Sequence, residues 1–160
     1  MVIKELTNPA LAQEMSDVNH AAFGYKQPRD LTRYQVQQRI KSWRYEAYGL
    51  MEKHHVVGFL YVDHLPRDFI EDPMEKCIES FSLLPWLHNR GLGKALLNHV
   101  VNETYPEASF NLCVNSNNKA TFLYEKFGFV NYGYNFMIKS QNYIAMGLIR
   151  RSNRKIGIGQ

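Results

Sequence analysis

The chain has 160 residues, of which 45% are hydrophobic and 13% are aromatic, a composition typical of one globular domain that excludes a disordered chain. The formal net charge is only +4, and the basic residues are scattered except near the C-terminus, so no nucleic-acid partner is expected. No apolar run approaches the roughly 18 residues of a membrane span and the N-terminus lacks a signal-peptide pattern, so we expect a cytoplasmic protein without a membrane partner.

The first sixty residues predict a strand, two helices and two further strands. A short strand over residues 2–6 is followed by Asn8 and Pro9, which favour the start of a helix, and Gly24 favours its end. The next elements are expected to be a helix that runs to Trp43 and two strands, over residues 31–43, 46–52 and 55–63.

A fourth strand is expected over residues 76–84, where Pro85 ends it. From Leu92 the apolar residues recur at helical spacing until Pro106, which indicates an amphipathic helix. The order strand, turn, helix places a helix N-terminus directly after the turn.

The turn itself, Gly91-Leu92-Gly93-Lys94, predicts an anion site. Free N–H groups and the positive end of the helix dipole point at the turn, and glycine lets a phosphate approach the backbone. Arg90 and Lys94 add positive charge, and Trp86 is expected to pack beneath the loop. We therefore predict a cradle for a diphosphate.

Two common phosphate motifs do not fit this turn. A dinucleotide fingerprint needs a third glycine at the position that Leu96 occupies. A Walker loop needs glycine at position 88 and serine or threonine at position 95, where this chain has His88 and Ala95.

The last fifty residues predict a strand, a helix and a hairpin. A strand over residues 109–114 precedes Asn117, which is placed to cap a helix that ends at Gly128. Strands over 130–139 and 143–149 are expected to turn at residues 140–142, and residues 152–160 read as a basic tail.

Both stretches together resemble the GNAT family of acyl-CoA-dependent N-acetyltransferases. The first family signature, Gln/Arg-x-x-Gly-x-Gly/Ala, is matched at Gly91 and Gly93 but departs at His88. The second signature is matched, after the strand, at Asn117, Ala120, Tyr124, Glu125, Lys126, Gly128 and Phe129. The resemblance covers residues 75–130 strongly. It implies one α/β domain over residues 1–151, with a mixed sheet of about seven strands whose two parallel central strands splay apart.

The resemblance also implies a site for acetyl-CoA and roles for its residues. Pantetheine is expected along the strand edge at Leu83, whose N–H is the expected oxyanion donor, and Tyr124 is the expected general acid for the leaving thiolate. The other expected cofactor contacts are His88, Asn89, Arg90, Gly91, Leu92, Gly93, Lys94 and Asn117.

Residue type alone allows two interpretations for Glu79 and two for Tyr124. A carboxylate on a mainly apolar strand, sharing a face with Phe81 and Leu83, is either a catalytic base or a structural ion pair. Without the motif, Tyr124 would be a core tyrosine. The histidines at 54, 55 and 64 and the cysteines at 77 and 113 lack the spacing of a metal site, so no metal is expected.

The function expected from this resemblance is transfer of an acetyl group from acetyl-CoA to a primary amine. The alternative is a non-catalytic acyl-CoA-binding module of the same fold. The amine stays open, as does homodimer formation, although the acidic residues of segment 63–75 favour a small cationic acceptor.

Overall fold

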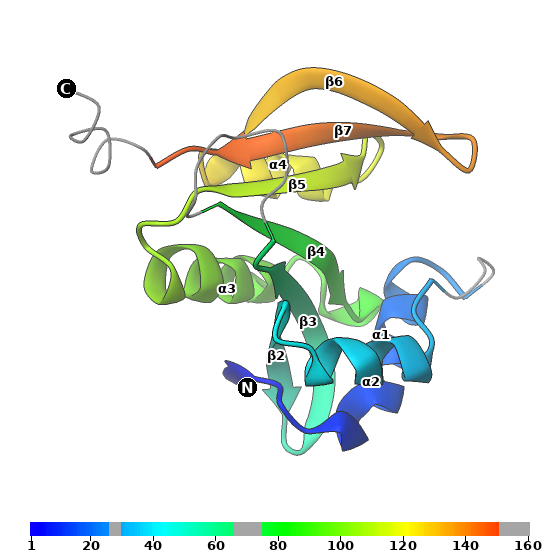
Figure 1. The fold of residues 1–160 in the computed structure, drawn as a ribbon. Helices are drawn as coiled ribbons and strands as arrows, with labels where there is room; N and C mark the ends of the chain where they lie inside the picture. Colours follow the sequence, from blue (N-terminus) through cyan, green and yellow to red (C-terminus); the bar gives the residue numbers. More distant parts are fainter. Residues whose placement is uncertain (26–29, 66–74, 151–160) are drawn as a thin grey trace. The chain divides into compact units, whose positions relative to one another are not determined.

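The structure is a computed structural model in which residues 1–25, 30–65 and 75–150 are described. Seven strands form one sheet in the order β1-β2-β3-β4-β5-β7-β6 (Figure 1). β4 and β5 pair in parallel, whereas β1–β2, β2–β3, β5–β7 and β6–β7 are antiparallel. The predicted α/β fold with a mixed sheet of seven strands is therefore confirmed. The basic tail at 152–160 lies outside the described residues.

The elements up to the third helix are β1 (Val2–Glu5), the 3-10 turn η1 (Pro9–Leu11), α1 (Ala12–Ala22), α2 (Arg33–Lys41), β2 (Tyr45–Glu52), β3 (His55–Asp63), β4 (Lys76–Leu83), the 3-10 turn η2 (Pro85–Leu87) and α3 (Leu92–Asn98). A π-helical segment η3 (His99–Thr104) continues α3 and is followed by β5 (Phe110–Asn115), α4 (Ala120–Lys126), β6 (Val130–Ile138) and β7 (Gln141–Leu148).

The chain forms two compact units. The first comprises residues 1–63 and 78–104, and the second comprises residues 64–77 and 105–160. β4 begins in the second unit and continues into the first.

In the first unit, α1 and α2 pack against β2 and β3 through an apolar core. This core includes Met15, Val18, Val36, Phe59 and Tyr61. α2 begins with a capping box, in which the side chains of Thr32 and Gln35 each bond the backbone N–H of the other residue, and ends at Lys41. The helix therefore stops before Trp43, which is 78% exposed, and the expected extension to Trp43 is wrong.

A second apolar cluster of the first unit holds the end of β4. Leu83 and Leu87 pack there with Leu50 and Val57, and Leu92 joins them from the start of α3. A side chain at Gly58 would lie 2.8 Å from Leu83 Cδ1 and 3.2 Å from Ser82 O, so glycine is what lets β3 approach β4 here. Both ends of the predicted anion loop thus rest on this cluster.

In the second unit, β5 lies between β4 and β7. The parallel register joins Lys76 to Phe110 and Cys77 to Asn111, whereas β5 and β7 pair along six positions. The hairpin turns at Lys139 and Ser140, which both have positive φ, and not at 140–142 as expected. Gly128, with φ +96°, ends α4 as predicted.

An ion pair with a buried carboxylate joins Arg44, the residue before β2, to Asp63 at the end of β3. Arg44 donates from Nε to Asp63 Oδ1 at 2.8 Å and from Nη2 to Oδ2 at 2.7 Å. The side chain of Asp63 is fully buried. The hydrogen bond to Asp63 is the main cause that raises the pKa of Arg44 above its ordinary value, so the pair stays charged.

We predict that Arg44→Met lowers the free energy of unfolding by about 2–4 kcal/mol, because it takes the bidentate arginine partner away from the buried Asp63 carboxylate. The effect should fall toward the low end because water reaches Arg44. The measurement is urea unfolding. The double variant Arg44→Met with Asp63→Leu should recover much of the loss, and a double variant as unstable as the single one would contradict this account.

Candidate functional site

The loop between β4 and α3 presents backbone donors at a helix start. Ala95 N donates to Gly91 O as the first helical bond, so the N–H groups of Leu92, Gly93 and Lys94 have no acceptor within the helix. Gly91, at the N-cap position, provides no side-chain cap. The loop residues before the helix are also set for an anion, because Asn89 and Gly91 both adopt left-handed backbone, with φ +63° and +76°.

The space in front of these donors is open. A side chain built at Gly91 would meet no atom within 4 Å, which is the room that a ligand oxygen needs to reach the backbone. Arg90 and Lys94 are both exposed on this loop. N–H groups without an acceptor in the helix, open space in front of them and two cationic side chains together fit a phosphate group.

His88 and Leu83, both expected to contact the cofactor, are brought together. The backbone carbonyl of Leu83 lies 2.9 Å from His88 Nε2, which must donate in this bond because a carbonyl only accepts. His88 therefore ties the loop to the end of β4. The expected position of Trp86 is wrong: Trp86 is 62% exposed, and the neighbouring Leu87 packs beneath the loop instead.

The middle of β4 departs from regular strand geometry. Ser80 has φ +55°, which interrupts the alternation on which we expected Glu79 to share a face with Phe81 and Leu83. Ser82 Oγ donates to Ser80 O at 3.0 Å and accepts from Asn19 Nδ2 at 3.0 Å. Asn19 on α1 thus supports the irregular strand, a contact that no sequence signal announced.

Glu79 has a cationic neighbour. Arg39 Nη1 of α2 lies 3.4 Å from Glu79 Oε2, and the two side chains are 27% and 19% exposed. The Arg39 guanidinium also lies over the rings of Tyr45 and Tyr61, at 4.9 and 5.1 Å from their centroids. The ion-pair interpretation of Glu79 thus finds a partner in Arg39.

Tyr124 is a buried residue of α4 in the second unit. Burial is the main cause that raises the pKa of its hydroxyl above the ordinary value, and Cys77 adds to the shift. Its ring packs against Phe129, with centroids 5.7 Å apart. The phenol is therefore protonated at any working pH, as a proton donor must be.

Lys119 stands at the N-cap position of α4, and the side chain that bonds the first N–H of the helix is that of Asn118 and not that of Asn117. Asn118 Oδ1 accepts from Ala120 N at 2.8 Å, and its backbone carbonyl accepts from Thr121 N at 3.1 Å. Asn117 is exposed and its N–H donates to Asn115 Oδ1 at 2.9 Å. The prediction of Asn117 as N-cap is wrong, because two adjacent asparagines are equally suited to bond the start of the helix and the backbone path decides between them.

The comparison with protein families decides what kind of domain this is. A family model described as acetyltransferase (GNAT) domain matches residues 11–150. The chain belongs to the GNAT acetyltransferase family. In sequence, no curated protein matches it.

Solved GNAT structures share the fold. The ribosomal-protein-S18-alanine N-acetyltransferase of Escherichia coli is similar with a TM-score of 0.71 at 20% identity, covering 92% of each chain. An aminoglycoside 6′-N-acetyltransferase complexed with coenzyme A gives 0.72 at 14% identity, over 92% and 96% of the two chains. The PaiA N-acetyltransferase of Thermoplasma acidophilum, also in complex with coenzyme A, gives 0.66 at 13%, over 91% and 98%.

Within 1–25, 30–65 and 75–150, no group of three or more histidine, cysteine or acidic side chains is able to hold a metal ion. None of the helices in these ranges is long and apolar enough to cross a membrane.

The bond between the Asn118 side chain and the first N–H of α4 should contribute to the stability of the protein. Asn118→Ala should lower the free energy of unfolding by about 1 kcal/mol, because the N–H of Ala120 loses its acceptor. The matched variant Asn117→Ala should change it by less than about 0.5 kcal/mol. Thermal unfolding of both variants measures this, and a larger loss at Asn117 would contradict the assignment.

Proposed function

We propose that the chain is an N-acetyltransferase that moves an acetyl group from acetyl-CoA to a primary amine by direct attack. The observation that carries this proposal is the start of α3, where three N–H groups without helical acceptors face open space beside Gly91. Membership of the GNAT family and the coenzyme A complexes of similar structures support it.

The cofactor contacts of the proposal follow from these donors. The diphosphate of acetyl-CoA binds the amides at the start of α3, with Arg90 and Lys94 neutralising its charge. Pantetheine runs along the edge of β4 at Leu83, and Asn117 bonds the same arm. The proposed cofactor-binding residues are therefore Leu83, His88, Asn89, Arg90, Gly91, Leu92, Gly93, Lys94 and Asn117.

The proposed reaction needs three proton and charge steps. The amine nitrogen, after losing a proton to water held by Glu79, attacks the thioester carbon and forms the C–N bond. The N–H of Leu83 donates to the oxyanion of the tetrahedral intermediate. The C–S bond then breaks and Tyr124 gives its proton to the leaving thiolate. The second amine proton passes to solvent, and solvent gives a proton back to Tyr124, which restores the starting state.

The alternative is a module that binds acyl-CoA without turning it over. The contact between Glu79 and Arg39 favours it, because an ion-paired carboxylate is a weaker base. Release of coenzyme A from acetyl-CoA across a panel of amines, with product detection by mass spectrometry, separates the two. Tight acetyl-CoA binding without turnover on any amine would replace the enzyme by the binding module.

We predict that Gly91→Val weakens acetyl-CoA binding by about tenfold or more, because a β-branched side chain enters the space in front of the amides and resists φ +76°. His88→Ala should weaken binding far less, because the backbone donors remain. Isothermal calorimetry measures both, with thermal unfolding to show that the variants fold. If both bind like the wild type, the cradle assignment is wrong.

We predict that Tyr124→Phe lowers kcat by roughly 10²-fold with little change in KM, because the hydroxyl acts mainly in the transition state. The rising limb of the rate against pH should stay in place, because the raised pKa of Tyr124 keeps the hydroxyl protonated across the working range. Steady-state kinetics measure both. Tyr134→Phe, on exposed β6, is the matched control and should match the wild type. Full kcat in Tyr124→Phe would make this tyrosine a core residue only.

A further inference from the structure

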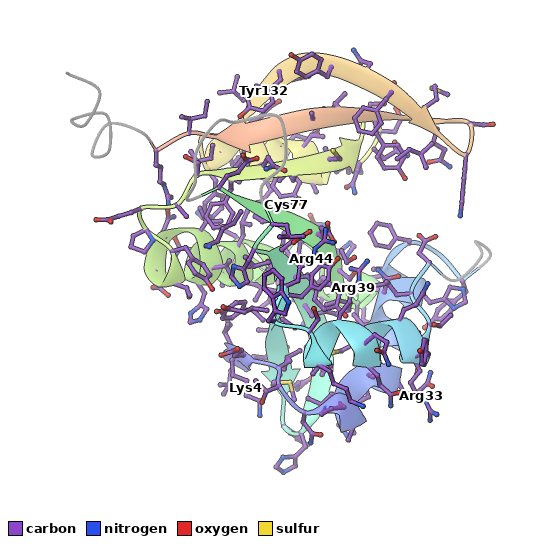
Figure 2. The ribbon with its side chains drawn as sticks, viewed as in Figure 1. Lys4, Arg33, Arg39, Arg44, Cys77 and Tyr132 are labelled. Atoms are coloured by element: carbon purple, nitrogen blue, oxygen red, sulfur yellow. The ribbon has the colours of Figure 1, made fainter. Side chains whose placement is uncertain are left out.

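The first unit carries two arginine–carboxylate pairs of different character. Their arginines, Arg39 and Arg44, are labelled in Figure 2. Arg44 and Asp63 form two hydrogen bonds at 2.8 and 2.7 Å, and Asp63 is fully buried. Arg39 and Glu79 share one contact at 3.4 Å and both remain partly exposed. A closed bidentate pair stabilises the fold, whereas a long and accessible contact contributes little to it.

Arg39 has more N–H donors than its contacts with the described residues use. Its guanidinium lies over Tyr45 and Tyr61 and, within the described residues, is seen to donate one hydrogen bond, to Glu79. A guanidinium has five N–H donors in a plane. The Tyr61 hydroxyl, from the same aromatic wall, is buried and has no hydrogen-bond partner among the described residues. A buried donor without an acceptor is costly, so an acceptor oxygen that inserts beside Arg39 and reaches this hydroxyl would stabilise the wall.

We propose that this cluster recognises an acceptor whose primary amine lies beside a carboxylate, as in an α-amino acid. The acceptor's ammonium pairs with Glu79 and its carboxylate pairs with Arg39, so one weak ion pair is exchanged for two. Arg39 and Tyr61 are specificity-determining residues in this assignment. The inference rests on the proposed function, because it names the amine for the same reaction.

Charge decides between a carboxylate and other acceptor groups. Arg39 and Glu79 sum to zero, and a zwitterion that inserts between them keeps that sum. A polyamine would place a second positive charge next to the Arg39 guanidinium, which would repel it. A phosphate dianion carries two negative charges, more than one guanidinium neutralises beside the Glu79 carboxylate. A planar fork also matches a carboxylate in a bidentate manner.

The acidic residues of segment 63–75 were expected to favour a small cationic acceptor. The structure gives less support to that expectation than the sequence did. Asp63 is paired with Arg44, and Glu75 is buried with Asn111 Nδ2 donating to its carboxylate. The other acids of this segment, Asp68, Glu71 and Asp72, lie outside the described residues.

The test uses matched acceptors that differ only in the carboxylate: tyrosine with tyramine, lysine with cadaverine, and histidine with histamine. With acetyl-CoA as donor, kcat/KM should favour the amino acid of at least one pair by about tenfold or more, the usual effect of a charge-assisted bond. Arg39→Gln should bring that ratio close to one. Arg33→Gln, an equal charge change at the exposed start of α2, should leave it unchanged.

Two further variants separate recognition from folding. Arg39→Lys keeps the charge but loses the planar fork, so the ratio should fall between the wild type and Arg39→Gln. Tyr61→Phe removes an unpaired hydroxyl, so thermal stability should hold or rise while the ratio falls. A Tyr61→Phe protein that keeps the full ratio would remove Tyr61 from the assignment.

Failure of the inference differs from failure of the proposed function. Equal turnover of both members of every pair would overturn the inference and leave the acetyltransferase standing. If no amine is turned over, calorimetric titration of the same pairs into the protein with coenzyme A decides. Amino-acid binding that Arg39→Gln abolishes would support recognition without catalysis, and equal or absent binding of both members would overturn it.

Discussion

Burial of three leucines holds the loop on which the proposed cofactor site depends. Leu83 ends β4, Leu87 lies in the turn after it and Leu92 starts α3, and all three pack on the cluster formed with Leu50 and Val57. Leu83 and Leu87 are buried and each stabilises the fold by about 1.5–3 kcal/mol, whereas Leu92 is partly buried and contributes less. The left-handed backbone of Asn89 costs about 1–2 kcal/mol. The apolar contacts therefore exceed the strain, and the amides of α3 are held open toward solvent.

The irregular segment of β4 is stabilised by polar contacts instead. Ser80 takes a left-handed conformation that a serine rarely adopts, and Ser82 and Asn19 bond beside it inside the protein. Backbone strain of this kind costs about 1–3 kcal/mol and persists only where its surroundings determine it. β4 is thus irregular where Glu79 and Leu83, the two residues of the proposed chemistry on this strand, flank the kink.

Two arginines, Arg39 near the end of α2 and Arg44 before β2, have different roles: Arg44 stabilises the fold, whereas Arg39 belongs to a pair that solvent reaches. Arg44 neutralises a carboxylate that water does not reach, so it serves the fold. Arg39 lies across two tyrosine rings and touches a carboxylate that water does reach. Since both arginines lie against Tyr45, one aromatic ring supports a structural pair and an accessible pair at once.

The sequence by itself determined the local features of this protein. Pro85, the glycines at 91 and 93 and the apolar spacing from Leu92 set the order strand, turn and helix, and Asn8, Gly24 and Gly128 mark helix ends where the structure has them. These signals work because they depend on neighbours within one turn of helix. The matches at Gly91, Gly93 and within 117–129 likewise pointed to the GNAT family, which the family comparison confirmed.

Only the tertiary structure decided which side chains meet. Arg39 and Glu79 are 40 residues apart, and Asn19 and Ser82 are 63 apart, so no spacing in the sequence relates them. The same reason explains the errors of one residue. Trp86 and Leu87 are both apolar, and Asn117 and Asn118 are equally good caps. The direction of the backbone, set by packing against distant strands, selected Leu87 and Asn118.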